Sequence, residues 1–193
     1  MPVSPAVRLV TERLVVALPG PEAASQVLAY FVDNRAHLEP WGPPVPEEFY
    51  SVGFHADRLL RAREDLADDR SLRLFLWDRG DEGGEVLGNI NFTQFSRGPF
   101  QSCMLGYGAA RRAQGTGMMH EALVASIAYV FDVLRLHRIQ AAYVPTNERS
   151  GRLLRRLGFT VEGYARDYLY IGGAWRDHIV TARTRPDAGP PGT

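Results

Sequence analysis

The sequence is organised around residues Ser102–Leu134, which read S-C-M-L-G-Y-G-A-A-R-R-A-Q-G-T-G-M-M-H-E-A-L-V-A-S-I-A-Y-V-F-D-V-L. The first part, Met104–Tyr107, suits a strand, and Gly106 and Gly108 predict a bulge or a close backbone approach within it. After the turn, the apolar residues recur at helical spacing, at Met119, Leu123, Ile127, Val130 and Leu134. The change of period predicts a helix that begins at Gly117–Met118.

The turn between this strand and this helix combines features that suit an anion. A helix start leaves backbone N–H groups unpaired, and the helix dipole adds partial positive charge there. Gly115 and Gly117 have no Cβ, so a ligand could approach that backbone closely, and Arg111 and Arg112 stand just upstream. A phosphate or pyrophosphate site is one interpretation. A plain strand-to-helix turn with two solvated arginines is the other.

Two familiar glycine motifs do not fit this turn. Gly115-Thr-Gly117-Met-Met-His120 lacks the third glycine of a dinucleotide fingerprint, and no Gly-Lys-Ser/Thr follows it as in a P-loop. What remains is Arg112-x-x-Gly115-x-Gly117. This pattern resembles the acyl-CoA pyrophosphate signature of the GNAT N-acetyltransferases, [Q/R]-x-x-G-x-[G/A].

Length and composition indicate an ordinary globular enzyme. The chain has 193 residues, which suits one domain, with 45% hydrophobic and 23% charged residues. The formal net charge of +0 argues against general nucleic-acid binding. Cys103 is the one cysteine, which excludes a disulfide framework and suits a reducing cytoplasm. The N-terminus lacks a signal-peptide core, and no run reaches the ~20 apolar residues of a membrane span.

The remaining elements are predicted from periodicity and breakers. Strands are expected at Val7–Leu18, Leu72–Asp78, Val86–Ser96, Arg138–Val144 and Phe159–Glu162, and a hairpin at Tyr168–Ile171 and Ala174–Ala182 across Gly172-Gly173. Helices are expected at Glu22–Asn34, Glu47–Leu66 and Glu148–Leu157, the last capped by Asn147. The Pro-rich segment Leu38–Pro44 must be a loop, in which Trp41 is expected to seal the core rather than wall a pocket. The order predicts an α/β (α+β) fold with a mixed sheet and helices against it.

That element order, together with several short motifs, resembles the GNAT fold over nearly the whole chain. The resemblance is greatest to the RimJ/RimL-type ribosomal-protein N-acetyltransferases, and especially to the RimJ branch. The matching pieces are T-E-R-L-V-V at Thr11–Val16, Asn34-Arg35 followed by L-E-P-W, the acyl-CoA turn, Asn147-x-x-Ser150, L-G-F-x-x-E-G at Leu157–Gly163 and G-x-W-R-D-H at Gly173–His178. The resemblance implies one acetyltransferase domain over residues 1–185, and residues 186–193 are expected to be a disordered tail.

The resemblance also implies which residues bind acetyl-CoA. The diphosphate is expected at the turn, and the pantetheine arm along the central strand and beside Asn147. The expected cofactor-binding residues are Leu105, Gly106, Tyr107, Arg111, Arg112, Gln114, Gly115, Thr116, Gly117, Met118 and Asn147. No metal is expected.

Direct acetyl transfer needs a neutral amine and a proton for the departing thiolate, and two residues are candidates for these tasks. Asp167, in Asp167-Tyr168-Leu169, matches a Glu-Tyr-Leu of the RimL branch and is the candidate base, with a shorter side chain. Alternatively, Asp167 starts a strand and accepts a backbone or arginine hydrogen bond. Ser150 matches the family's Asn-x-x-Ser and is the candidate proton donor, or it helps to cap its helix. Glu162 and Asp177 are weaker candidates for the base.

Other constellations do not support a different chemistry. His120-Glu121 begins like a zinc-protease helix, but position 124 is Val instead of His, so a zinc site is rejected. Cys103 lies in a predicted strand with no evident base beside it in the sequence, and is expected to be a small buried hydrophobe.

The leading hypothesis is an enzyme that acetylates the N-terminal alanine of a small-subunit ribosomal protein, as the RimJ resemblance implies. A second hypothesis keeps the chemistry and changes the acceptor to a small amine such as an antibiotic, a polyamine or an amino acid. A third is a non-catalytic acyl-CoA-binding or ribosome-assembly protein, because a fold alone does not fix a function. The expected partners are acetyl-CoA and the acceptor amine, with a homodimer possible and neither nucleic acid nor membrane involved.

Overall fold

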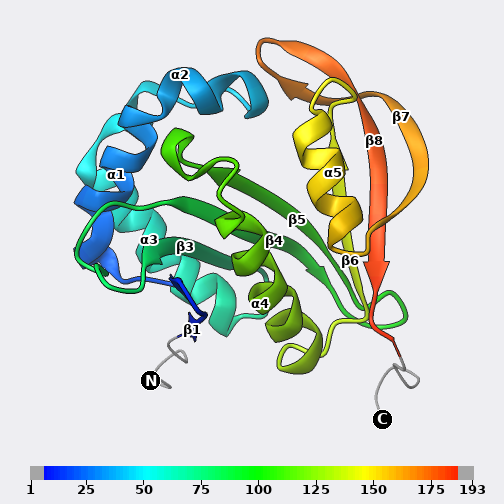
Figure 1. The fold of residues 1–193 in the computed structure, drawn as a ribbon, viewed down its shortest axis with the longest axis horizontal. Coiled ribbons are helices and arrows are strands. Elements are labelled where there is room, and N and C mark those ends of the chain that lie inside the picture. Colours follow the sequence, from blue (N-terminus) through cyan, green and yellow to red (C-terminus); the bar gives the residue numbers. More distant parts are fainter. Residues whose placement is uncertain (1–6, 187–193) are drawn as a thin grey trace.

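The centre of the fold is an eight-stranded mixed sheet with the strand order β1-β2-β3-β4-β5-β6-β8-β7 (Figure 1). The computed structural model describes residues 7–186. The strands are β1 (Arg8–Val10), β2 (Leu14–Ala17), β3 (Leu72–Asp78), β4 (Gly88–Ser96), β5 (Ser102–Ala109), β6 (Arg138–Tyr143), β7 (Thr160–Ile171) and β8 (Ala174–Thr184). The predicted fold class, a mixed sheet flanked by helices, is confirmed.

Helices cover both faces of this sheet. The α-helices are α1 (Ala24–Asp33), α2 (Arg35–Leu38), α3 (Val52–Ala67), α4 (Met118–Asp132) and α5 (Glu148–Arg156), and short 3-10 turns lie at Pro21–Ala23, Glu39–Trp41, Glu47–Tyr50 and Arg111–Ala113. In Figure 1, α4 and α5 lie in front of the sheet and α3 lies behind it. The two faces therefore differ in the helices that pack against them.

The one parallel strand pair in the described sheet opens partway along its length. β5 and β6 pair only over Ser102–Leu105 and Arg138–Ala141, and every other neighbouring pair is antiparallel. From Gly106 onward, β5 keeps β4 as its neighbour on one side and has no strand on the other, while β6 continues beside β8. The sheet therefore splits at the ends of β5 and β6.

The core lies between α4 and the sheet and between α1, α3 and the sheet. Leu123, Ile127 and Val130 of α4 are buried at the predicted helical spacing, and α4 begins at Met118 as the change of period predicts. Burial of side chains of this size contributes about 1.5–3 kcal/mol each. This packing fixes the start of α4 against the end of β5.

The predicted first strand, Val7–Leu18, is wrong in one respect, because it folds as the β1–β2 hairpin. The Thr11 N–H donates to the Leu14 carbonyl at 2.9 Å, and the Leu14 N–H donates to Thr11 Oγ1 at 3.1 Å. A threonine hydroxyl that bonds its own local backbone competes with a continuous strand. Apolar periodicity alone does not reveal that competition.

The predicted helix Glu47–Leu66 is interrupted at Ser51. A 3-10 turn, Glu47–Tyr50, precedes α3, and Ser51 caps α3 by accepting the Phe54 N–H at 3.3 Å. Leu59 is buried as expected, whereas Leu60 is 48% exposed. The serine is a helix N-cap that the apolar pattern does not reveal.

The Pro-rich segment also differs from its prediction. Leu38 and Glu39–Trp41 are helical turns, and a loop follows from Gly42. Trp41 is 44% exposed, so the expectation that it seals the core is wrong. The Gly172 N–H donates to the Gly42 carbonyl at 3.3 Å, which brings the tip of the β7–β8 hairpin against this loop.

The C-terminal strands are longer than predicted. Phe159–Glu162 and Tyr168–Ile171 belong to one strand, β7, whose register against β8 shifts at Val161/Gly163 and at Ala165/Leu169. The two-glycine hairpin is confirmed, with φ 57 at Gly172 and 79 at Gly173. Residues 187–193 of the predicted tail lie outside the described residues.

Candidate functional site

The turn between β5 and α4 offers free backbone donors. Gly115 and Gly117 have φ 75 and 82, a conformation that side chains rarely adopt. Within residues 7–186, the N–H groups of Gly115, Thr116 and Gly117 donate no hydrogen bond. They lie at the positive end of the α4 dipole, so the turn suits a negatively charged group.

Arg13 holds this turn from the β1–β2 hairpin. Its Nη1 donates to the Thr116 carbonyl at 3.0 Å, and its Nε pairs with Glu121 Oε2 at 2.7 Å. Thr11 Oγ1 also donates to Glu121, at 2.6 Å. Burial acts to raise the pKa of Glu121, but the hydrogen bonds from Thr11 and Arg13 outweigh it and hold the pKa below its usual range. Glu121 is therefore a structural anchor.

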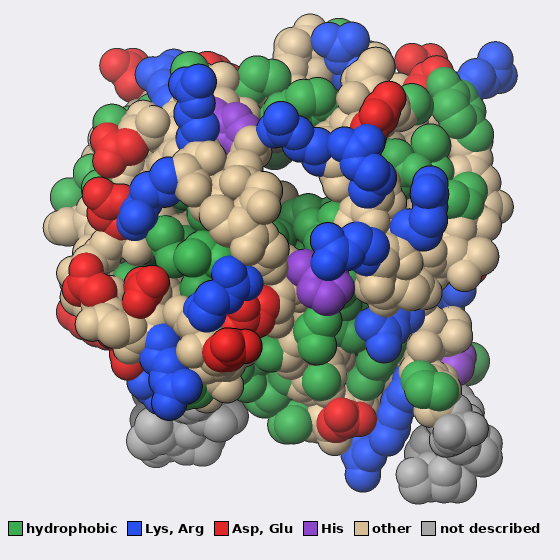
Figure 2. Space-filling model, viewed as in Figure 1, with side chains coloured by type: hydrophobic (Ala, Val, Ile, Leu, Met, Phe, Trp, Pro, Cys, Tyr) green, Lys and Arg blue, Asp and Glu red, His purple; other side chains and the backbone are tan. Residues whose placement is uncertain are grey.

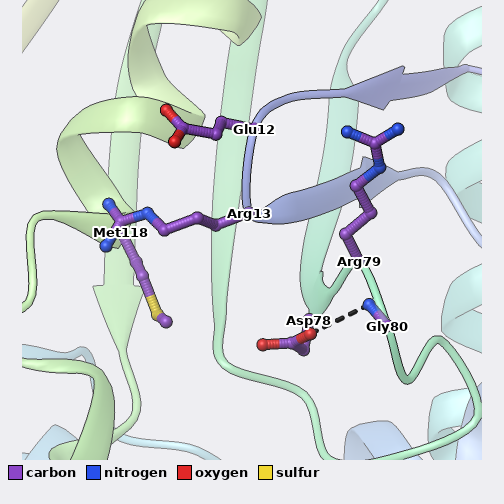
Figure 3. A pocket seen from close by; sticks show the side chains of 6 residues that line it. All are labelled: Glu12, Arg13, Asp78, Arg79, Gly80 and Met118. Carbon is purple, nitrogen blue, oxygen red and sulfur yellow. Dashed lines mark hydrogen bonds between the residues drawn. The ribbon is translucent and has the colours of Figure 1, made fainter.

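A shallow hollow beside this network does not itself suit catalysis. Its lining residues, shown in Figure 3, are Glu12, Arg13, Asp78, Arg79, Gly80 and Met118. Asp78 Oδ1 accepts the Gly80 N–H at 2.9 Å, and Arg79 Nη1 donates to the Thr11 carbonyl at 3.3 Å. Arg13, Asp78 and Arg79 are therefore engaged in contacts of the fold.

The predicted residues Arg111, Arg112 and Gln114 have partners outside the turn, Arg111 through its backbone. Arg112 pairs with Glu85 of the β3–β4 connection at 2.7 Å, and the Arg111 N–H donates to Asn34 Oδ1 at 2.8 Å. Gln114 lies between two helices, with its Nε2 2.6 Å from His37 Nε2 and its Oε1 accepting from Arg149 Nη1 at 2.6 Å.

Gln114 therefore connects α2 with α5 in front of the sheet split. Figure 2 shows an opening in this part of the molecule, with basic side chains at its rim. Because the sequence contains arginine and no lysine, these side chains are arginines. The rim therefore adds positive charge beside the free N–H groups of the turn.

Ser150 and Tyr107 form a hydroxyl pair across the split. Ser150 Oγ, in the first turn of α5, lies 2.7 Å from Tyr107 Oη on β5. Burial raises the pKa of Tyr107 to about 12, while the hydrogen bond with Ser150 opposes that change. Both hydroxyls therefore remain protonated at neutral pH. The sequence singled out Ser150 and the backbone of Tyr107, but not the Tyr107 hydroxyl.

Asn147 caps α5 as predicted. Its Oδ1 accepts the Ser150 N–H at 3.2 Å, which fixes Ser150 in the first turn. Gly151 follows at a close contact, because a Cβ there would lie 2.8 Å from the Tyr143 ring. This packing sets the distance between the start of α5 and the end of β6.

The glycines of β5 do not produce the expected bulge. Gly106 and Gly108 continue the regular pairing with Asn91 and Asn89, and the register shift lies instead between Thr93 and Ser96. Gly108 is required by packing, since a Cβ would lie 3.0 Å from Asn89 Oδ1 and 3.2 Å from Tyr30 Oη. The free edge of β5 comes from the divergence of β6. Leu105, the last residue paired with β6, is buried.

Asp167 lies in the irregular part of β7. It has φ 45, and it falls within the register shift between Ala165 and Leu169. Its N–H donates to Asp177 Oδ1 at 2.9 Å, while its exposed carboxylate accepts no hydrogen bond within residues 7–186. The alternative in which the Asp167 carboxylate accepts a backbone or arginine hydrogen bond is therefore wrong.

The two weaker candidates for the base are held by partners. Glu162 forms an ion pair with Arg138. Asp177 accepts from Tyr164 Oη at 2.5 Å as well as from Asp167, and these hydrogen bonds hold its pKa below the usual range. Of the three carboxylates, Asp167 is the one left free to accept a proton. Cys103 is buried as expected, and burial raises its thiol pKa to about 12.

The structure also places residues that the sequence did not single out. His37 and Arg149 contact Gln114, and Arg58 and Arg73 lie on the opposite side of the sheet from Ser150. Alternation along β5, which puts Tyr107 and Leu105 on one face, could have indicated the Ser150–Tyr107 pair. No local pattern could have indicated the others, because each depends on contacts between distant segments.

The helix start with free N–H groups at Gly115–Gly117 matches the acyl-CoA turn that the sequence resemblance predicts, and the opening between β5 and β6 beside it comes from the structure alone. A family model described as "Acetyltransferase (GNAT) domain" matches residues 13–160. The chain belongs to the GNAT acetyltransferase family, and it is an acetyl-CoA-dependent N-acetyltransferase.

Individual relatives match over nearly the full chain. The [Ribosomal protein uS5]-alanine N-acetyltransferase of Escherichia coli is 45% identical over 184 residues, which cover 95% of this chain and 93% of that protein. The ribosomal-protein-S5-alanine acetyltransferase structure from Vibrio fischeri has a TM-score of 0.90 at 35% identity, covering 95% of this chain and 100% of that one. RimJ of Mycobacterium smegmatis, solved with CoA-disulfide, has a TM-score of 0.83 at 25% identity, covering 95% and 90%.

No helix among residues 7–186 is both long enough and apolar enough to cross a bilayer. Within the same residues, no three His, Cys, Asp or Glu side chains are grouped so that they could hold a metal ion.

Proposed function

We propose that this enzyme acetylates the N-terminal alanine of the ribosomal protein uS5. The observation that carries the proposal is the 45% identity to the Escherichia coli uS5-alanine N-acetyltransferase across 95% of the chain. With it we propose that the reaction takes place in the cytoplasm, where ribosomal proteins are made. A small amine is the less favoured acceptor, because the match to the alanine N-acetyltransferases extends over the regions that border the sheet split.

The residues present fit acetyl-CoA. The N–H groups of Gly115, Thr116 and Gly117 are free to bind its diphosphate, and Arg111, Arg112 and the N–H of Met118 lie beside them. The unpaired edge of β5, from Gly106 to Ala109, offers backbone groups to the pantetheine arm and donors for the acetyl oxygen. When bound, acetyl-CoA supplies an acetyl group activated as a thioester.

Ser150 would protonate the departing thiolate. Its hydroxyl is fixed by the Asn147 cap and lies 2.7 Å from Tyr107 Oη, which can return a proton to it. Because burial keeps Tyr107 protonated, the pair holds two protons beside the split. We assign proton donation to Ser150 and its support to Tyr107.

Asp167 would accept the proton of the amine, directly or through water. Its carboxylate has no partner within the described residues, and the bulge of β7 exposes it. An α-amino group has a pKa of about 7.7–8.0, so a modest base is enough. Within the described sheet, β7 is an edge strand, so one of its sides pairs with no other strand.

The proposal is tested with the purified enzyme, acetyl-CoA and a synthetic peptide of the uS5 N-terminus from the same genome. Mass spectrometry of the peptide and the release of free thiol should report stoichiometric N-terminal acetylation. The enzyme contains no lysine, so acetylation of its own lysine side chains cannot contribute to thiol release.

Matched controls are the same peptide with a blocked N-terminus and a panel of free amines that includes spermidine. Faster turnover on a free amine than on the uS5 peptide would reject the proposal. In a deletion strain, uS5 that keeps its acetylated N-terminus would reject it independently.

A further inference from the structure

The face of the sheet opposite Ser150 carries a polar row that leads away from the split. Cross-strand pairing places Arg73 of β3 beside Asn91 of β4, and Asn91 beside Gly106 of β5. Arg73 Nη1 donates to Asn91 Oδ1 at 3.1 Å, which confirms that the two side chains share a face. Gly106 is exposed, and a Cβ there would meet no atom within 4 Å. The row is therefore open at the end that borders the split.

A second arginine, Arg58 of α3, lies over this region. Its guanidinium carbon is 5.4 Å from the centre of the Phe49 ring and 5.8 Å from that of Phe31. Burial and the charge of Arg73 together lower the pKa of Arg58 to about 10. Helix α3 packs against β3, which places Arg58 and Arg73 on the same side of the sheet.

Neither guanidinium has a carboxylate partner in the part of the chain that the structure describes. Within residues 7–186, no Asp or Glu oxygen lies within 4.0 Å of a nitrogen of Arg58 or Arg73. Asp65 acts on Arg73 at longer range, but it accepts from Arg70 at 2.9 Å. Partial burial of two like charges is unfavourable unless an anion is bound. The arginines that do form ion pairs lie mostly on the surface, where an ion pair contributes little to the free energy of folding.

We propose that Arg58 and Arg73 bind an acidic side chain of the acceptor polypeptide, a few residues after its acetylated N-terminus. The inference rests on the proposed function, because it requires an acceptor that is a polypeptide. Two inter-strand steps separate Gly106 from Arg73, or about 10 Å, which an extended chain covers in about three residues. Planar guanidinium groups match the two oxygens of a carboxylate, and Phe31 and Phe49 hold Arg58 for that contact.

The test uses a set of N-terminal alanine peptides in which one Glu is moved through positions two to six, with Gln at the same positions as the reference. The wild-type enzyme should use the best Glu peptide about tenfold more efficiently than its Gln counterpart, the scale of a charge-assisted hydrogen bond. The difference should appear in KM for the peptide with kcat unchanged, as expected of a contact made equally before and during transfer.

Arg58→Gln and Arg73→Gln should each remove most of this preference while leaving KM for acetyl-CoA unchanged. Arg61→Gln is the matched control, because it removes the same charge from an exposed position of α3 and should keep the preference. Arg73→Lys retains the charge without the planar guanidinium group and should keep part of the preference for Glu peptides.

Equal use of Glu and Gln peptides by the wild-type enzyme at every position would overturn the inference and leave the proposed function intact. A preference that survives in both Gln variants would overturn the assignment to these arginines. If no alanine peptide is acetylated, the proposed function fails and the inference fails with it.

Discussion

The two sides of β5 are built in different ways. On the side of α4 and α5, the site is a backbone turn with free N–H groups, and one hydroxyl pair at 2.7 Å. On the side of α1 and α3, side chains from α1, α3, β3 and β4 meet, and two of them are arginines that have no carboxylate partner among residues 7–186. The first side carries the turn proposed to bind acetyl-CoA. The second side carries the arginines proposed to contact the acceptor.

This difference indicates where the specificity for the acceptor could change with little effect on the fold. The turn depends on the positive φ of Gly115 and Gly117 and on the anchor between Arg13 and Glu121, so changes there affect the fold. Arg58 contacts the Phe31 and Phe49 rings and Arg73 donates to Asn91, so neither side chain contributes to the turn. The predictions below separate the two sides.

The largest effect is expected on the α5 side. Ser150→Ala should lower kcat by about 100-fold, the lower end of the range for general acid catalysis, with KM for acetyl-CoA unchanged. Steady-state kinetics with the uS5 peptide measures both constants. Tyr107→Phe is the companion variant and should retain more activity, since Ser150 remains. A Ser150→Ala enzyme with wild-type kcat would remove Ser150 from the mechanism.

The second effect concerns stability on the α3 side. His55 is buried among Phe31, Phe49 and Phe54, and within residues 7–186 neither ring nitrogen forms a hydrogen bond of normal geometry. Burial and the charge of Arg58 lower its pKa to about 4.

Because the unfolded chain binds a proton at His55 below pH 6.5 and the folded chain does not, stability should fall as the pH drops from 6.5 to 4. At pH 4.5 the proton uptake at His55 should lower the free energy of unfolding by about 2 kcal/mol, and the His55→Phe variant should not show this loss. Urea unfolding at pH 7 and pH 4.5 measures the difference, and an unchanged pH dependence in the variant would contradict it.

A smaller effect is expected at β7. Asp167→Asn should slow acetylation about tenfold at pH 7, because the reaction then depends on the fraction of α-amino groups already neutral. The variant should approach the wild type above pH 8, where most of the amine is neutral. Parallel pH profiles for the two enzymes would exclude Asp167 as the base, and Asp177→Asn tests whether the neighbouring carboxylate acts instead.

The smallest effect is expected at the turn itself. Gly117→Ala places a Cβ on a residue with φ 82, which costs about 1 kcal/mol in the free energy of unfolding and should raise KM for acetyl-CoA by tilting the free N–H groups. Gly53→Ala is the control, because it lies in α3 with nothing within 4 Å of its Cβ and should be neutral or stabilising. Equal KM values for the two variants would mean that the turn does not position the ligand.

Several parts of this site could be predicted from the sequence because they are local. The start of α4 at Met118, the cap at Asn147 and the hairpin at Gly172-Gly173 each depend on residues within a few positions of one another. The motif Arg112-x-x-Gly115-x-Gly117 contains the glycines that give the turn its positive φ values. Such geometry is set by steric limits on the backbone, which apply wherever the segment lies in the fold.

Other parts were predicted wrongly because they depend on contacts between distant residues. The free edge of β5 was expected from a bulge at Gly106 and Gly108, yet it arises because β6 diverges toward β8. Trp41 was expected to seal the core, yet it is 44% exposed. Apolar content and glycine positions do not determine which neighbour a strand keeps.

The sequence by itself determined the start of α4, the glycines of the turn before it and the position of Ser150 in the first turn of its helix, because period, caps and glycines act over a few residues. Only the tertiary structure decided that Tyr107 meets Ser150, that Glu162 and Asp177 are engaged while Asp167 is free, and that Arg58 and Arg73 face the same region. Those relations join segments tens of residues apart, and the free energy that fixes them comes from packing across the whole sheet.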